Sequence, residues 1–165
     1  MMNDRVFPVW VADQRFAYNT LERWAVNDPL LAGKLDVTRI GSFGHSFGGA
    51  TALEVCRSDT RCRAAVNMDG GLYGKIVTEP AVELPGSTHY SFTITQLLSP
   101  LLVPKGFDPR AGLRIVDKYL RTFFDIHLRG MEKLPLEPAS GQTDVRWLAN
   151  RKIRSPSSTT WPRRQ

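Results

Sequence analysis

The sequence has no long apolar run and only a few cysteines and histidines. None of its 165 residues belongs to an apolar stretch of 18, which excludes a membrane-spanning helix. Its two cysteines, Cys56 and Cys62, are too few to form a structural zinc site by themselves. They could form a short disulfide in an exported protein, but we favour a pair of buried thiols because free cysteine is often buried.

The start of the chain lacks the apolar segment of a secretory signal and carries an acid and a base within "MMNDR". We therefore expect a cytoplasmic protein. Apolar residues make up 42% of the chain and charged residues 23%, which is ordinary for a folded globular protein. The length suits one domain.

Acidic residues are missing from residues 145–165, which carry six basic side chains. The rest of the chain is balanced in charge, so the net charge of +6 belongs to this end. Such an end could touch nucleic acid or anionic lipid, but its Ser, Pro and Arg content favours a solvated, disordered extension. We expect a folded domain at 1–137, a disordered basic tail at 138–165, and no nucleic-acid partner.

Short apolar runs alternate with segments of helical spacing along the chain. This alternation is typical of an α/β fold, in which helices flank a small, mostly parallel sheet. Pro85-Gly86 should stop the last strand, and Gly130 should cap the last helix. The expected elements are an amino-terminal helix with Ala12, Phe16, Leu21 and Trp24 on its apolar face, strands at 37–43, 62–69 and 81–86, and helices at 47–57 and 111–130, the last with Leu113, Val116, Leu120, Phe123 and Leu128 on one side.

The pentapeptide "GHSFG", which begins at Gly44, matches the G-x-S-x-G motif between a strand and a helix. In this motif a sharp turn exposes the serine hydroxyl, and Gly44 and Gly48 leave room where a Cβ would clash. Ser46 is therefore the candidate nucleophile. The backbone N–H of Phe47, at the start of the helix, is the candidate donor to an oxyanion. Gly49 should let the helix pack close to the strand. The alternative interpretation of the motif is a glycine-rich turn between strand and helix in which the serine has no catalytic role.

A serine nucleophile needs a base, and the chain offers three histidines. His45 adjoins the serine, but its side chain should diverge from the hydroxyl. His127 falls inside the long helix, which suits a structural or surface role. His89 lies in a loop after the last candidate strand, where an α/β-hydrolase carries its base. We predict His89 as the base, with an ordinary exposed loop histidine as the alternative.

The acid that orients the base should follow the strand after the serine. Asp69 stands at the end of that strand, at the sheet edge where Ser46 also emerges. A plain turn aspartate is the alternative interpretation, because Asp-Gly-Gly favours tight loops. The rival acids are Asp59, Glu79 and Glu83.

Three segments resemble the platelet-activating factor acetylhydrolase family of the plasma or isoform II type: "GHSFGGATALEVCRSDTRCRAAVNMDGGLYG", "PGSTHYSFTITQLLSPLL" and "GLRIVDKYLRTFFDIHLRG". The resemblance covers roughly residues 10–135. It implies an α/β-hydrolase fold with Ser46 as nucleophile, Asp69 as acid and His89 as base.

The resemblance also implies an activity that the residues alone do not reach. It implies a carboxylic-ester hydrolase, phospholipase A2-like and calcium-independent, that removes short acyl chains from glycerophospholipids without a metal or other cofactor. Phospholipid or small-ester substrates and transient contact with a membrane surface follow from it. Phe92 and Leu98, with Leu97, Leu101 and Leu102, are candidates to line an acyl pocket or rest on lipid, and core packing is the alternative.

Two features depart from the family pattern. Members of the family carry a large amino-terminal half that supplies a second oxyanion donor, whereas about 36 residues precede the first strand here. Asp69 and His89 lie close together in the chain, without room for the usual strand and helix between them. We therefore expect a truncated member with about three strands, and a catalytically impaired remnant or binding protein is the alternative function.

Overall fold

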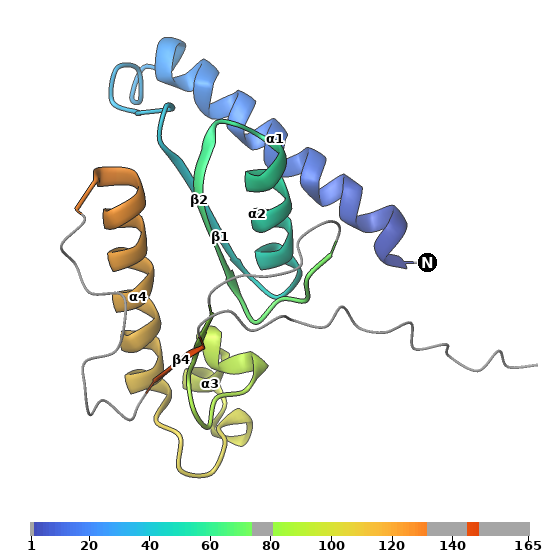
Figure 1. Cartoon of the computed structure of the whole chain (residues 1–165), viewed down its shortest axis with the longest axis vertical. Helices are drawn as coiled ribbons and strands as arrows, with labels where there is room; N and C mark the ends of the chain where they lie inside the picture. The colour runs from blue at the N-terminus through green and yellow to red at the C-terminus, as the bar shows by residue number, and fades with distance from the viewer. Residues whose placement is uncertain (1, 74–80, 132–144, 149–165) are drawn as a thin grey trace, which may run out of the picture.

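The computed structural model of the chain describes residues 2–73, 81–131 and 145–148 (Figure 1). Within these ranges helices and strands alternate through the first half of the chain, and the second half consists of helices between two short strands. No helix in the described ranges is both long and apolar enough to cross a bilayer. The elements are α1 (Met2–Asn27), β1 (Ile40–His45), α2 (Phe47–Ser58), β2 (Cys62–Met68), β3 (Ala81–Glu83), the 3-10 helix η1 (His89–Phe92), α3 (Thr95–Leu98), the 3-10 helix η2 (Pro100–Leu102), α4 (Pro109–Arg129) and β4 (Arg146–Leu148).

The central sheet consists of β1 and β2, which pair in parallel from Ile40 opposite Cys62 to His45 opposite Met68. Both strands are therefore oriented with their carboxyl ends at the same edge. The next residues in the chain, Ser46 and Asp69, emerge there side by side. The backbone N–H of Ser46 donates to the carbonyl of Met68 at 2.9 Å, which ties the two strand ends together.

The expected third strand does not join this sheet. β3 pairs antiparallel with β4 in a separate two-stranded sheet, with Val82 opposite Trp147. The prediction of about three parallel strands was therefore wrong for the described residues. A parallel crossover needs a dozen or more residues, usually with a helix, and the connection from β2 to β3 is at that lower limit.

Helices cover both faces of the central sheet (Figure 1). α1 and α2 lie on one face and α4 on the other. Gly41 of β1 lies directly beneath α4, because a Cβ at this position would stand 2.6 Å from Phe124 and 2.8 Å from Leu128. Asp108 caps the start of α4, where its side chain accepts from the N–H of Arg110, and Gly130 caps the end with φ 71°. This helix confirms the prediction for 111–130, although the inner contact residue Phe124 was not foreseen.

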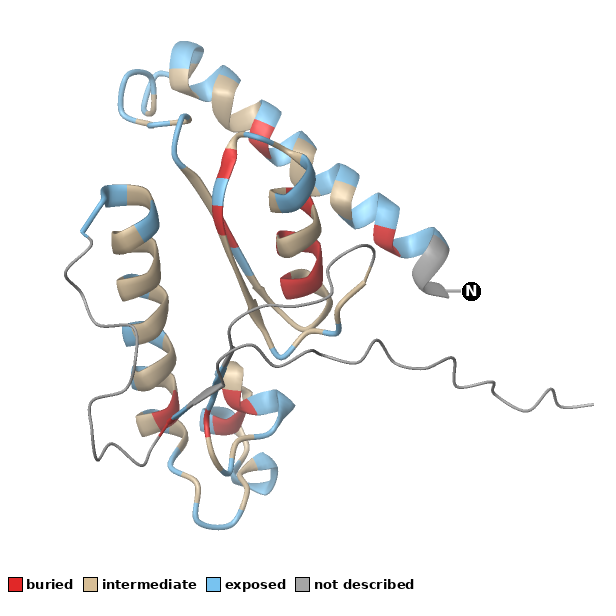
Figure 2. Ribbon diagram, in the orientation of Figure 1, coloured by how far each residue is buried: buried red, intermediate tan, exposed pale blue. Residues whose placement is uncertain are grey.

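The core lies between α1, α2 and the sheet, and Figure 2 shows its buried residues concentrated on α2 and β2. Tyr18, Val55 and Cys62 form its centre. The predicted apolar face of α1 is the wrong face: Phe16 is 65% exposed, whereas Tyr18 is buried. The inner face is partly polar, because the Tyr18 hydroxyl hydrogen-bonds to buried Ser42, and apolar spacing alone could not reveal it.

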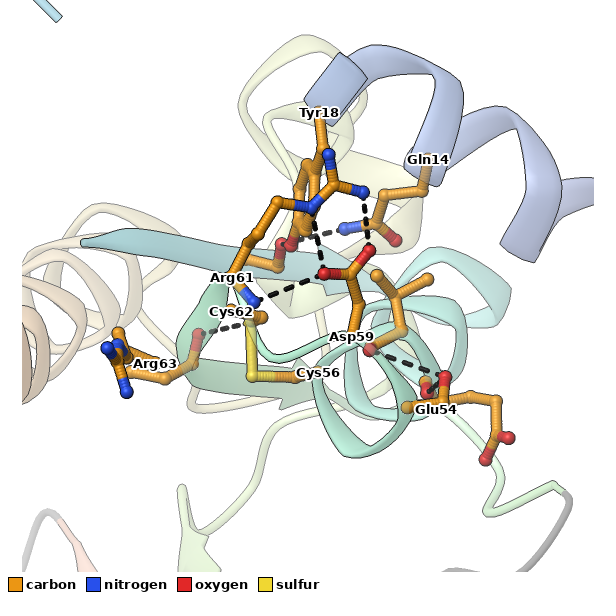
Figure 3. Close-up of a disulfide and its surroundings, with 12 residues drawn as sticks. Gln14, Tyr18, Glu54, Cys56, Asp59, Arg61, Cys62 and Arg63 are labelled. Atoms are coloured by element: carbon orange, nitrogen blue, oxygen red, sulfur yellow. Dashed lines mark hydrogen bonds and ion pairs between the residues drawn. A yellow bond between two sulfur atoms is a disulfide. The ribbon is translucent and has the colours of Figure 1, made fainter. Parts of the chain in front are cut away.

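Cys56 and Cys62 form a disulfide between the end of α2 and the start of β2 (Figure 3). The interpretation of two buried thiols was therefore wrong. Their Cα atoms are 4.8 Å apart because a tight turn joins the two elements. In that turn Asp59 accepts from the backbone N–H of Arg61 at 3.1 Å and from its guanidinium. This pairing lowers the pKa of the Asp59 carboxyl.

The carboxyl-terminal segment is described only at residues 145–148. Val145 is buried, and Arg146–Leu148 form β4. The expectation of disorder over 138–165 does not hold for these residues, and the remainder of that range lies outside the described residues.

Candidate active site

Ser46 occupies a strained turn between β1 and α2. Its backbone has φ 57° and ψ −127°, which residues with a Cβ rarely adopt. The turn is held because the carbonyl of Ser46 accepts from the N–H groups of Gly49 and Ala50, while its own N–H is bound across the sheet. This is the geometry that the G-x-S-x-G pattern predicts.

The glycines of the turn do not share one role. A Cβ at Gly44 would lie 2.4 Å from the carbonyl carbon of Gly48, so the strand and helix backbones meet at this position. A Cβ at Gly49 would lie 2.2 Å from Asn67 Oδ1 of β2, which confirms that this glycine permits close packing. A Cβ at Gly48 would meet nothing within 4 Å, so the prediction that position 48 requires glycine for space was wrong.

Asp69 also has left-handed backbone geometry, with φ 53°. Aspartate tolerates this region better than most residues. Asn67 stabilises the turn, because its side-chain amide accepts from the N–H of Gly70 and donates to the Gly70 carbonyl. Gly70 in turn lies against the serine, and a Cβ there would stand 2.1 Å from the Ser46 carbonyl oxygen. The two strained turns are therefore packed on each other.

The structure brings Asp69 and His89 together. Asp69 Oδ2 lies 2.7 Å from His89 Nδ1. A carboxylate only accepts, so Nδ1 carries the proton in this pair and a neutral ring keeps its lone pair on Nε2. The two side chains are 49% and 43% exposed, so the pair is open to solvent.

The Ser46 hydroxyl is not joined to this pair. Within the described ranges it makes no hydrogen bond to the His89 ring. Hydrogen bonds of this kind are often long in an empty site and close when substrate binds. The N–H groups of Phe47 and Gly48, in the first turn of α2, lie beside the serine and have no acceptor among the described residues.

The sequence-based analysis missed a contact made by His45. Its Nε2 lies 2.8 Å from the backbone carbonyl oxygen of His89, and the two rings are 4.3 Å apart. We predicted that the His45 side chain diverges from the nucleophile, but not what it contacts. The alternation of side chains along a strand could have predicted its direction, because it places His45 on the sheet face opposite its neighbour Gly44.

The turn that carries His89 has further supports. Thr88 and Ser91 form a capping box around η1, and Ser91 is buried. Gln96 is also buried and donates through Nε2 to the carbonyl of Leu102 at 2.7 Å and to Thr88 Oγ1 at 3.3 Å. A short, largely exposed 3-10 turn is thereby fixed beside the sheet edge.

The rival candidates lie away from this cluster. Asp59 pairs with Arg61 at the opposite end of β2, and Glu83 pairs with Arg146 at 3.7 Å. His127 is on α4 and packs against Phe123, with ring centroids 4.4 Å apart and the two rings tilted. Glu79 lies outside the described residues.

The apolar candidates after His89 divide into two groups. Phe92 lies next to the site, with its ring stacked on that of His45 at 6.4 Å. Leu98 is 77% exposed and Leu101 95% exposed, so core packing does not explain them. We call the exposed apolar side chains of the segment from η1 to η2 the apolar patch: Tyr90, Ile94, Leu97, Leu98, Leu101 and Leu102.

A second oxyanion donor from an earlier strand is not found in the described residues. The segment before β1 is α1 followed by turns, and it reaches the sheet at the amino end of β1. The site stands at the carboxyl end. Instead α1 brings Phe7 and Trp10 against the side chain of Phe47, with ring centroids 5.5 and 4.9 Å apart.

The fold is that of an α/β-hydrolase, present in part. The structure of a ferulic acid esterase from Streptomyces cinnamoneus is similar, with a TM-score of 0.70 and 24% sequence identity. The similarity covers 90% of this chain and 56% of the esterase chain. The parallel pair, the serine turn and the flanking helices agree with this class, as the sequence predicted.

The resemblance to the platelet-activating factor acetylhydrolase family is confirmed. The family described as "Platelet-activating factor acetylhydrolase, isoform II" matches residues 25–81, which include Ser46 and Asp69 but not His89. A protein of Arthroderma benhamiae named "Probable 1-alkyl-2-acetylglycerophosphocholine esterase" is 51% identical over 39 residues. That match covers 24% of this chain and 10% of the relative, so the chain spans a small part of the relative's length.

Proposed function

We propose that this chain is a serine carboxylic-ester hydrolase in which Ser46, His89 and Asp69 act as nucleophile, base and orienting acid. The observation that carries the proposal is the 2.7 Å contact between Asp69 Oδ2 and His89 Nδ1 at the sheet edge where Ser46 stands in its strained turn. The family match supports ester hydrolysis as the reaction class.

The chemistry follows from the protonation states. As Ser46 Oγ attacks the ester carbonyl carbon, its proton passes to the free Nε2 of His89. Asp69 stabilises the imidazolium that forms. The N–H of Phe47 donates to the developing oxyanion, and the amino end of α2 adds partial positive charge there. His89 then protonates the departing alkoxide, and water repeats the sequence on the acyl-enzyme to release the acid.

The proposed substrate is a glycerophospholipid ester with a short acyl chain. The support is the name of the Arthroderma relative together with the apolar patch beside His89. An exposed apolar surface next to the base suits an ester that is presented at a lipid-water interface. The patch would then rest transiently on the lipid while the ester reaches Ser46.

A second candidate function is a catalytically impaired remnant or binding protein of the same family. Two observations favour it: the missing hydrogen bond between Ser46 and His89, and the lack of a second oxyanion donor before β1 in the described part of the chain. Loss of one oxyanion donor alone costs about 2.7–4 kcal/mol of transition-state stabilisation, or roughly 10²–10³ in rate.

Hydrolysis of p-nitrophenyl acetate by the full chain separates the two functions. We expect turnover that is abolished in Ser46→Ala and falls by up to about 10⁴ in Asp69→Asn, because asparagine tolerates the backbone of position 69 but cannot fix the ring in the same way. His89→Gln should also abolish turnover. The control His127→Gln should leave it unchanged. Turnover that persists in Ser46→Ala would remove the esterase proposal.

A further inference from the structure

We infer that His45 is a positioning residue that holds the base in register with the nucleophile. This inference rests on the proposed function. It assigns a role to the side chain next to Ser46, which neither the mechanism above nor the motif requires.

The hydrogen-bond chemistry fixes the direction of the contact. The atom facing His45 Nε2 is the backbone carbonyl oxygen of His89, at 2.8 Å. A carbonyl only accepts, so Nε2 of His45 carries the proton and donates. The neutral ring is therefore in the Nε2–H tautomer.

Two side chains outside η1, Asp69 and His45, hold His89 at different points. Asp69 accepts from ring Nδ1, and the His45 ring donates to the backbone carbonyl. Asp69 sets the tautomer and one edge of the ring. His45 fixes the backbone from which the ring projects. The rings of His45 and His89 also pack at 4.3 Å, so the contact limits tilting of the base.

The position of His45 couples the base to the nucleophile. It is the last residue of β1, and the strained residue Ser46 follows it directly. A shift of η1 would move His89 relative to the serine, and β1 opposes this shift through His45. η1 needs such a support because it is a turn of four residues whose first two members are exposed. A displacement of about 1 Å at such a site can cost about 10² in rate.

Two variants separate the hydrogen bond from the ring. His45→Phe keeps an aromatic ring against His89 but removes the donor, whereas His45→Gln keeps an N–H at a similar reach from Cα. For p-nitrophenyl acetate we expect kcat to fall by about 10–100-fold in His45→Phe with KM nearly unchanged. We expect His45→Gln to recover kcat to within a few fold of the parent protein.

Equal kcat in the parent and His45→Phe would overturn the inference, and so would an equal fall in both variants. Absence of turnover in the parent protein would instead contradict the proposed function. The inference would then be decided by NMR of the His89 Nδ1–H resonance, which reports the hydrogen bond to Asp69. It should broaden or disappear in His45→Phe and persist in His45→Gln, and persistence in both would overturn the inference.

Discussion

At the scale of single residues, the site depends on backbone positions that few side chains can occupy. Ser46 and Asp69 both have positive φ, and they are the non-glycine residues with this geometry in the described chain. Each is tied down by its neighbours, Ser46 through hydrogen bonds across the sheet and Asp69 through the Asn67 clamp on Gly70. Strain of about 1–3 kcal/mol per residue persists only where the surroundings hold it in this way.

Two glycines of the serine motif provide a matched pair for testing this packing. Gly44→Ala should lower the free energy of unfolding by about 1–3 kcal/mol, because the new Cβ would meet the backbone of Gly48. Gly48→Ala should be neutral or stabilising by up to about 1 kcal/mol, since its Cβ would enter open space in a helix. Urea denaturation measures both, and equal losses in the two variants would contradict the packing described for the turn.

At the scale of elements, α2 and β2 are joined by a covalent bond as well as by packing. Val55 of α2 is fully buried, and the Cys56–Cys62 disulfide joins the end of the helix to the start of the strand. The same turn is closed by Asp59 and Arg61, whose guanidinium also reaches Glu22 of α1 at 2.9 Å. Disulfides persist mainly in oxidising compartments, so this bond does not favour the cytoplasmic location expected from the sequence.

Removal of the disulfide should weaken this unit. In the double variant Cys56→Ser/Cys62→Ser we expect a loss of about 2 kcal/mol in unfolding free energy, the value the chain-entropy account gives for so short a loop. Reduction of the parent protein with dithiothreitol should produce a similar loss. If dithiothreitol left the denaturation midpoint of the parent protein unchanged, the result would contradict a stabilising disulfide between Cys56 and Cys62.

The packing of α1 on β1 predicts a dependence on alkaline pH. Burial is the main factor that raises the pKa of Tyr18 above its ordinary value of 10.0, and its hydroxyl bonds to Ser42. The unfolded chain therefore loses this proton at a lower pH than the folded chain. The contribution of Tyr18 to stability is intact below pH 10 and is lost as the pH rises further.

Tyr18→Phe isolates this effect. Above pH 10 the unfolding free energy of the parent protein should decline more steeply than that of the variant, by up to about 1.4 kcal/mol per pH unit. Chemical denaturation at several pH values between 8 and 12 measures the difference. Parallel curves for the two proteins would show that Tyr18 titrates alike in the folded and unfolded chain.

The elements also show what the sequence could and could not predict. β1, α2, β2 and α4 follow from apolar spacing and from the glycine turns, and Asp69 and His89 follow from chain order in the hydrolase pattern. The inner face of α1 was missed because it carries polar Gln14 and a tyrosine hydroxyl where apolar side chains were expected. The antiparallel partner of β3 was missed because strand pairing over such a distance depends on tertiary contacts that spacing does not encode.

At the scale of the whole molecule, exposed apolar side chains lie both beside the proposed site and far from it. The apolar patch adjoins the base, whereas Val26 and Leu30 lie at the other end of the sheet, near the end of α1. If the patch serves an interfacial substrate, only its members should affect activity on aggregated lipid. Single exposed side chains of this kind contribute little to stability.

Leu98→Ser and Val26→Ser test this distinction, because the two side chains are 77% and 72% exposed. We expect Leu98→Ser to reduce hydrolysis of a short-chain phospholipid in vesicles several-fold while hydrolysis of soluble p-nitrophenyl acetate is retained. Val26→Ser should change neither rate. Equal rates on vesicles for Leu98→Ser and the parent protein would remove the interfacial role of the patch.

The central claim, that three side chains of this partial hydrolase fold form a working nucleophile, is tested most directly by covalent labelling. The folded chain is treated with a fluorophosphonate, and intact-mass and peptide mass spectrometry locate the adduct. The account predicts a single adduct on Ser46 that is missing from Ser46→Ala and forms at least about 100-fold more slowly in His89→Gln. A folded protein that gains no adduct on Ser46, or gains it equally fast without the His89 imidazole, would contradict it.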